Sequence, residues 1–320
     1  MAPRAMLVAA GFGTRLEPLT RELPKPAVPV GNRPAAWFAF DHLRRAGVRD
    51  FVVNTHHLAA ELRAALEPLV PSDAALRFVH EEQILGTGGG VRNAWQPQRD
   101  EDFVVMNAKL LFAPDLQRAL RVHRESGAIA TMVLRSMPPS TSGGPSFAPV
   151  EVDGAGRIRK LRGLPKAADS GTLAPRMYTG LQILSARAHR ELPQDGDIIE
   201  HAYLHWIARG ETVMGVLDDS PWMDVGVTPR HYLEANLALA TGAIEWPGIH
   251  PGEGATLIAP DAHLDPAATV ERSVLGPRAI IQAGTTLRDC VVWPGATAPP
   301  GDHDRTIFTT GGRMVSVARK

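Results

Sequence analysis

The sequence predicts an α/β domain followed by a short left-handed parallel β-helix, with the change near Gly242. Up to that glycine, short apolar runs typical of strands alternate with amphipathic patterns typical of helices. This alternation predicts parallel strands joined by crossover helices. Beyond it the helical period stops, and aliphatic residues recur six positions apart, which is typical of hexapeptide-repeat β-helices. The predicted domains are therefore residues 1–242 and 243–320.

The elements of the α/β domain follow from hydrophobic periodicity. The strand-like runs are residues 5–10, 51–57, 76–82, 102–108 and 211–219, with a hairpin at 150–163. The helical patterns are residues 34–47, 58–69, 87–96, 114–127, 197–210 and 228–242. Asp153 and Gly154 predict the hairpin turn, and Gly242 closes the last helix.

The tail from residue 243 carries the repeat. Ile258, Leu264 and Val270 stand six apart among small residues and prolines, so we expect them to stack inside a triangular prism. With about eighteen residues in each coil, only about two coils fit. So short a prism exposes an apolar end, which predicts either self-association into a homo-oligomer or packing against the α/β domain.

Composition excludes several classes of partner. The chain of 320 residues has 34 Lys plus Arg and 34 Asp plus Glu, so its formal charge is zero. A neutral chain without a basic run offers no electrostatic footprint for nucleic acid or for a membrane surface. Its single cysteine, Cys290, rules out a disulfide framework, and no stretch approaches the roughly 20 apolar residues of a spanning helix. We expect a cytoplasmic protein.

A glycine loop follows the first predicted strand directly. Gly11, Gly13 and Thr14 can present backbone N–H groups as a nest around phosphates. A dinucleotide fold would need a third glycine where Leu16 stands, and an acidic residue after the second strand, and both are absent. The loop therefore predicts a phosphate site that differs from the dinucleotide pattern.

Two cations extend this phosphate site. Arg15 lies in the loop itself, and its planar guanidinium suits bidentate contact with phosphate oxygens. Lys25 stands between Pro24 and Pro26, which fix the backbone on either side and hold the ammonium near the loop.

These motifs resemble those of the sugar-1-phosphate nucleotidyltransferase family. GFGTRLEPLT with the later PKP is similar to the family's opening signature, EEQILGTGGGVRNA looks like its base-binding stretch, and WMDVG is similar to its Trp-x-Asp-Val-Gly ending. With the repeat, the resemblance covers essentially the whole chain. It implies a Rossmann-like mixed sheet, and an enzyme that makes an NDP-sugar and pyrophosphate from a nucleoside triphosphate and a sugar 1-phosphate.

Two groups within the family are the most similar. The triple glycine followed by Asn93 and Ala94 looks closest to N-acetylmuramate-1-phosphate uridylyltransferases, whereas the short tail is more like mannose-1-phosphate guanylyltransferases. The implied triphosphate is GTP or UTP, and the base and the sugar both stay open.

The resemblance also assigns roles. Arg15 would hold the β and γ phosphates, Lys25 would neutralise charge on the α-phosphoryl oxygens, and Asp224 would hold the family's Mg²⁺. Catalysis of this kind is mostly positioning and stabilisation of charge. The residues placed at the nucleotide are Ala9, Gly11, Gly13, Thr14, Glu82, Gly88, Gly89 and Lys109.

Lys109 departs from the family pattern. The family holds Mg²⁺ with two carboxylates, and the first belongs to an Asn-Gly-Asp turn that is here Asn107-Ala108-Lys109. An ammonium beside Asp224 keeps the net charge but removes a ligand, so Mg²⁺ binding is expected to be weakened or absent. Three interpretations follow. Lys109 replaces the metal in a slow or altered transferase, or the chain is a regulatory nucleotide-binding or nucleotide-sugar-binding protein without catalysis, or Lys109 is a solvated residue on a shifted loop.

The sugar side also departs from the family. Its Glu-Lys-Pro after the hairpin is here LRGLPKA, so no glutamate matches, and Lys166 or Arg162 would meet the sugar phosphate. Gly180 fits the family's sugar-side glycine, whose missing side chain lets a ring approach the backbone.

Overall fold

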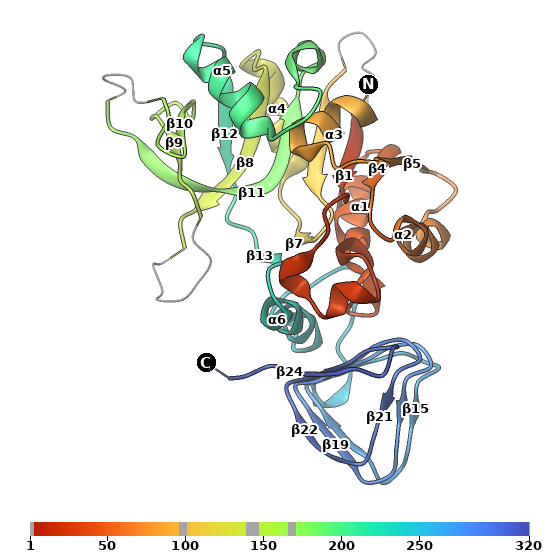
Figure 1. Cartoon of the computed structure of the whole chain (residues 1–320). Coiled ribbons are helices and arrows are strands. Elements are labelled where there is room, and N and C mark those ends of the chain that lie inside the picture. Colours follow the sequence, from red (N-terminus) through yellow and green to blue (C-terminus); the bar gives the residue numbers. More distant parts are fainter. Residues whose placement is uncertain (1–2, 96–100, 139–146, 166–170, 320) are drawn as a thin grey trace.

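The computed structural model describes residues 3–95, 101–138, 147–165 and 171–319, and Figure 1 shows an α/β body above a prism of short strands. A nine-stranded sheet forms the centre of the body. Its strands are β1 (Arg4–Val8), β4 (Asp50–Thr55), β5 (Ala75–His80), β6 (Phe103–Asn107), β8 (Ala130–Ser136), β9 (Val150–Val152), β10 (Ile158–Leu161), β11 (Ala174–Leu184) and β12 (Val213–Leu217).

The sheet is mixed, as the resemblance implied. Its main path runs β10-β9-β11-β6-β1-β4-β5, and β8 pairs with both β11 and β12. The strands β6, β1, β4 and β5 are parallel to one another, and so are β8 and β12. The long strand β11 runs antiparallel to β6, β8 and β9. The expectation of parallel strands is therefore confirmed for the group β6, β1, β4 and β5 and for the pair β8 and β12, but not for β11. Periodicity did not identify β11, because Gly180, with φ of 95°, interrupts its pattern.

Helices cover both faces of the sheet and form where the amphipathic patterns predicted them. They are α1 (Ala35–Arg45), α2 (Ala59–Leu66), α3 (Gly86–Ala94), α4 (Leu116–Glu125), α5 (Leu204–Ala208) and α6 (Pro229–Ala240). Thr228 caps α6 by accepting a hydrogen bond from the His231 N–H, and Pro229 starts the helix. The helix expected over 197–210 is divided into a π-helical turn, η6 (Ile199–Tyr203), and α5.

Short elements connect the longer ones. The 3-10 helices are η1 (Thr14–Leu16), η2 (Leu19–Arg21), η3 (Lys25–Ala27), η4 (Glu67–Leu69), η5 (Ala186–Glu191) and η7 (Glu253–Ala255). Two small antiparallel ladders join β2 (Pro29–Val30) to β3 (Arg33–Pro34), and β7 (Leu110–Phe112) to β13 (Trp222–Asp224).

The tail forms a parallel β-helix, seen as the triangular prism in Figure 1. Its strands are β14 (Leu257–Ile258), β15 (His263–Leu264), β16 (Thr269–Glu271), β17 (Val274–Leu275), β18 (Ile280–Ile281), β19 (Thr285–Arg288), β20 (Val291–Val292), β21 (Thr297–Ala298), β22 (Gly301–Asp304), β23 (Thr306–Phe308) and β24 (Met314–Ser316). Two of its faces stack three parallel strands each, the third stacks the four strands β14, β17, β20 and β23, and β24 pairs antiparallel with β23 at the end of the prism.

The expectation of about two coils was therefore too low. The third coil contains β20, β21 and β22. Its strands β21 and β22 carry Thr297, Ala298 and the sequence GDHD, so the aliphatic repeat is hidden there by small and polar residues.

Ile258, Leu264 and Val270 occupy the expected positions but are not enclosed. They pair with Leu275, Ile281 and Leu287 of the next coil, which are buried. Among the described residues no further strand pairs with the outer side of β14 or β15, and Ile258 remains 44% exposed and Leu264 41% exposed. The prediction that all of these side chains lie inside the prism was thus wrong for these two.

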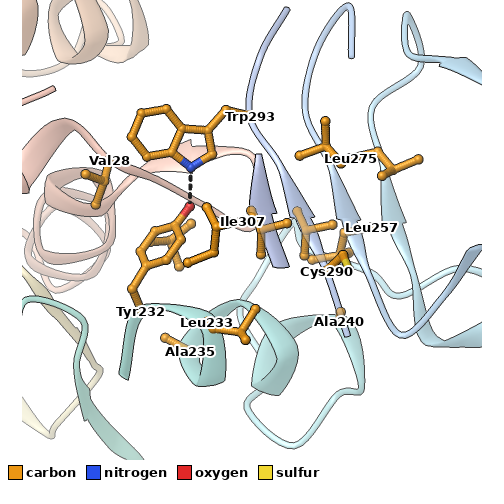
Figure 2. Close-up of a cluster of buried hydrophobic side chains, with 14 of the residues drawn as sticks. Val28, Tyr232, Leu233, Ala235, Ala240, Leu257, Leu275, Cys290, Trp293 and Ile307 are labelled. Carbon is orange, nitrogen blue, oxygen red and sulfur yellow. Dashed lines mark hydrogen bonds between the residues drawn. The ribbon is translucent and has the colours of Figure 1, made fainter. Parts of the chain in front are cut away.

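One flank of the prism packs against the α/β body (Figure 2). Tyr232 and Leu233 of α6 share a buried cluster with Trp293 and Ile307 of the prism. The Trp293 indole N–H donates to the Tyr232 hydroxyl at 2.9 Å, and that hydroxyl donates to the Pro29 carbonyl at 2.5 Å. The two parts are therefore joined through a buried, hydrogen-bonded contact.

Two single features complete the description. Cys290 is buried, and burial raises the pKa of its thiol to about 11, as is typical of an unreactive structural cysteine. Among the described residues, none of the helices combines the length and the apolar character that crossing a membrane requires.

Candidate active site

Polar groups gather where the parallel strands end. The Ala9 N–H, just after β1, donates to the Asn54 side-chain oxygen at 2.7 Å. The Asn54 amide donates in turn to Glu81 at 2.8 Å, and the other oxygen of Glu81 accepts from the Leu85 N–H at 3.1 Å. Asn54 and Glu81 were not among the predicted site residues. Their position at the carboxyl ends of neighbouring parallel strands was the signal that could have found them.

The glycine loop is a compact series of single helical turns. Gly13 has φ of 74°, and a Cβ there would lie 2.9 Å from the Thr20 methyl carbon and 3.2 Å from the Lys25 Cβ. The Thr20 hydroxyl donates to the Gly13 carbonyl at 3.1 Å. Gly13 is thus required for folding the loop onto Lys25, whereas Gly11 is exposed, with open space at its Cα.

Lys25 and Lys109 converge on Gly226. A Cβ at Gly226 would lie 2.4 Å from the Lys25 Cδ and 2.9 Å from the Lys109 Cδ. The two lysines come from separate elements, Lys25 from the loop after β1 and Lys109 from the turn between β6 and β7. The absence of a side chain at Gly226 therefore lets two cations approach each other.

Charge–charge interactions connect this pair to the rest of the predicted site. The pKa of Lys25 is lowered to about 8, chiefly by burial and then by the positive charges of Lys109 and Arg15, while Asp224 opposes the change. Three cations against one carboxylate leave the cluster with an excess of positive charge, which suits a polyanionic ligand.

Lys109 is paired with Asp224. The ammonium lies 2.5 Å from Asp224 Oδ2, and the two side chains are only 19% and 13% exposed. The other oxygen, Oδ1, accepts the Gly226 N–H at 2.9 Å. The β7–β13 ladder sets this geometry by pairing Leu110 with Asp224. The interpretation of Lys109 as a solvated residue on a shifted loop is therefore wrong.

The predicted base-binding stretch divides into packed and open residues. A Cβ at Gly88 would lie 2.5 Å from Pro193, and a Cβ at Gly89 would lie 2.4 Å from the Gln194 carbonyl. Both glycines are thus needed for packing α3 against residues 193–196. Glu82 is exposed, and it is the buried Glu81 that bonds to its surroundings.

The predicted sugar-side residues have different surroundings. A Cβ at Gly180 would lie 2.6 Å from the Asn107 amide nitrogen, so this glycine lets β11 approach the end of β6. Arg162 donates to Glu200 at 2.8 Å and lies 3.8 Å from Asp197, so its charge is compensated. It also lines a cavity of about 190 Å³ together with Tyr178. Lys166 lies outside the described residues.

Comparison with known proteins agrees with this arrangement. A family model described as Nucleotidyl transferase matches residues 4–242. A UTP–glucose-1-phosphate uridylyltransferase of Synechocystis sp. is 26% identical over 95% of this chain and 87% of its own. A mannose-1-phosphate guanylyltransferase of Mycobacterium tuberculosis is 27% identical over 93% of this chain and 81% of its own.

A solved structure of UDP-glucose pyrophosphorylase from Acinetobacter baumanii shares the fold, with a TM-score of 0.59 and 21% identity over 78% of this chain and 96% of that one. The family model spans well over half of the sequence and includes the glycine loop, Lys109 and Asp224. The chain therefore belongs to the nucleotidyl transferase family.

Proposed function

We propose that the protein transfers a nucleotidyl group from GTP or UTP to a sugar 1-phosphate, which yields an NDP-sugar and pyrophosphate. The observation that carries the proposal is the convergence of Lys25 and Lys109 on Gly226 beside Asp224, next to a glycine loop at the end of β1. The relatives named above use uridylyl and guanylyl donors with glucose and mannose 1-phosphates, which supports this class of substrates and leaves the choice open.

The reaction needs little beyond positioning and charge. An oxygen of the sugar phosphate attacks the α-phosphorus in line, the new P–O bond forms, and the bond to pyrophosphate breaks. In the proposal, Arg15 holds the β and γ phosphates and Lys25 stabilises charge on the α-phosphoryl oxygens. Gly11 and Thr14, both exposed in the loop, supply N–H donors. Arg162, Lys166 and Gly180 are assigned to the acceptor side.

A Mg²⁺ ion held by two carboxylates does not fit the residues at Asp224. Both of its oxygens are engaged, one by Lys109 and one by the Gly226 N–H. Among the described residues, no group of three or more His, Cys, Asp and Glu side chains is placed to hold a metal. We therefore assign the positive charge at this position to the Lys109 ammonium, which acts as a point charge and cannot bridge two phosphates as an octahedral ion does.

The test of this function compares the wild type with Lys109→Asp. GTP and UTP are each offered with a panel of sugar 1-phosphates, and pyrophosphate release is measured with a chelator and with Mg²⁺. The wild type should turn over at least one pair, and its triphosphate affinity should depend little on Mg²⁺. Lys109→Asp places two carboxylates together, so it should bind triphosphate poorly in chelator and well in Mg²⁺.

Lys160→Asp makes the same charge change on β10 and should behave as the wild type. Triphosphate binding without pyrophosphate release from any pair would reject the transferase in favour of a regulatory nucleotide-binding protein. If Lys109→Asp bound triphosphate equally well with and without Mg²⁺, residue 109 would not face the phosphates.

We also propose that the protein self-associates through the open end of its β-helix. The strands β14, β15 and β16 each lie at the outer end of a ladder, and Ile258 of β14 and Leu264 of β15 are exposed there. A second copy presents the same apolar end, so two ends can stack about a twofold axis.

A further inference from the structure

Glu22 links the glycine loop to the far end of the chain. It directly follows η2 and stands three positions before Lys25. Its Oε1 accepts the Thr309 hydroxyl at 2.7 Å and lies 2.5 Å from the Arg313 guanidinium, while Oε2 accepts the Gly311 N–H at 2.7 Å. All three partners lie in the turn between β23 and β24, almost 290 residues away in sequence.

The turn is shaped around this carboxylate. A Cβ at Gly311 would lie 2.8 Å from the Glu22 carboxyl carbon, so only glycine allows the approach. The buried Thr309 accepts the Arg313 N–H at its hydroxyl, at 3.1 Å, and donates its own N–H to the Arg313 carbonyl at 2.9 Å. The hydroxyl that bonds to Glu22 is thus held by the turn itself.

The Glu22 carboxylate is mostly buried, and its surroundings stabilise its negative charge. Its side chain is 14% exposed, and burial alone would raise its pKa. The hydrogen bonds from Thr309, Gly311 and Arg313 outweigh burial and lower the pKa of Glu22 below its ordinary value. Since the negative charge is compensated by Arg313, it does not oppose a phosphate ligand at the neighbouring Lys25.

Apolar contacts hold the loop to the α/β body, because Leu16 and Leu19 lie in the same buried cluster as α6, and Leu23, next to Glu22, packs against two buried clusters. Thr20 bonds to Gly13 within the loop, and Glu17 pairs with Arg21 in an exposed ion pair, a kind that contributes little. The Glu22 cluster joins the outer side of this loop to the β-helix. Lys25 follows Glu22 by three residues. Its position therefore depends on the contacts of the loop with the α/β body and on the contacts of Glu22 with the β-helix.

We propose that the β23–β24 hairpin is a clamp that holds the nucleotide loop in its binding conformation through Glu22. Glu22 is a positioning residue, and the β-helix thereby contributes to the site without touching the ligand. The identity of that ligand rests on the proposed function. Releasing the clamp lowers the fraction of molecules with a competent loop, so the apparent affinity for triphosphate falls by that fraction.

The test uses Glu22→Ala and Arg313→Ala, with Arg319→Ala as the matched control. Arg319 is a cation of the same tail that pairs with Asp304 and does not contact Glu22. Amide hydrogen exchange over residues 13–25 should accelerate about tenfold in both variants while exchange in α4 stays unchanged. The Kd for GTP or UTP should rise about three- to tenfold, and the Glu22→Ala Arg313→Ala double variant should lose no more than either single change.

Arg313→Lys keeps the positive charge, so it should restore part of the protection of residues 13–25 from amide hydrogen exchange. Exchange over residues 13–25 that matches Arg319→Ala in both variants would overturn the clamp, as would additive effects in the double variant. A wild type that binds neither triphosphate would contradict the proposed function instead, and the exchange comparison would still decide the clamp.

Discussion

Lys25 lies among two other cations, Arg15 and Lys109, and one anion, Asp224. Burial and the neighbouring positive charges disfavour its protonated form, so the site releases a proton at a lower pH than an exposed lysine would. A bound triphosphate opposes this effect, because its roughly four negative charges favour the protonated form of Lys25 and so raise its pKa. Ligand binding and protonation of Lys25 are therefore linked.

Triphosphate affinity should fall as the pH rises through the pKa of Lys25, about 8. Between about pH 7 and about pH 9 the loss should be about tenfold, since the protonated fraction falls by that factor. Lys25→Arg keeps its charge and should give a flat profile by isothermal titration calorimetry. An equal slope in wild type and variant would show that another group is responsible.

The same pKa has a consequence for the unliganded protein. The folded value lies below the ordinary value of 10.5, so the unfolded chain binds more protons in the interval between them. The contribution of Lys25 to the free energy of unfolding therefore rises with pH across that interval. Binding of triphosphate and stability without it thus change in opposite directions as the pH increases.

At the scale of elements, the turn after β13 brings the two lysines together. The ladder of β7 with β13 sets Asp224 beside the Lys109 turn, and Gly226 leaves the space that both lysine side chains fill. The approach comes from two strands that are separated by more than one hundred residues. The sequence pattern of either segment alone does not predict that the two lysines meet.

Gly226→Ala should weaken triphosphate binding at least about tenfold. The new Cβ would lie only 2.4 Å from the Lys25 Cδ, so the lysine side chain would have to move away. The free energy of unfolding should change by less than about 1 kcal/mol, since a lysine side chain can rotate away. Gly154→Ala is the matched control, with open space around its Cβ. Equal affinity in the two variants, measured by calorimetry beside denaturant unfolding, would contradict this account of Gly226.

Elements were predicted well where the pattern was local. The helices α1, α4 and α6 formed within a few residues of their expected ranges, because each carries an apolar face and suitable end residues. Two strands of the sheet were missed: β11, since Gly180 and its bulge break the alternation, and β8, although its residues form a continuous buried run. The third coil was missed because its strands β21 and β22 lack the aliphatic repeat.

At the scale of the whole molecule, the β-helix has one covered flank and one open end. The flank shares a hydrophobic cluster with α6, so the alternative of packing against the α/β body is confirmed. The first coil still exposes Ile258 and Leu264. Packing against the α/β body and self-association through the open end are therefore compatible with each other. The domain boundary at residue 242 stays a prediction.

Leu264→Arg should shift the protein toward a lower mass in light scattering, because a buried charge in a stacked end is costly. Leu217→Arg adds the same charge at an exposed leucine of the α/β body and should leave the mass unchanged. The melting temperature at low concentration should be similar in both variants. A wild type that is monomeric at all concentrations would reject the proposed stacking.

The sequence by itself determined the α/β class and the repeat, and it predicted the glycine loop with Arg15, Lys25 and Asp224 as site residues, because each of these features is a local pattern or a matching motif. It also raised the question of Lys109. Only the tertiary structure decided that Lys109 pairs with Asp224, that Asn54 and Glu81 support the loop, and that Glu22 is held from the last hairpin. These contacts join segments far apart in the chain, and the physical reason is that burial and close approach depend on packing, which no single segment encodes.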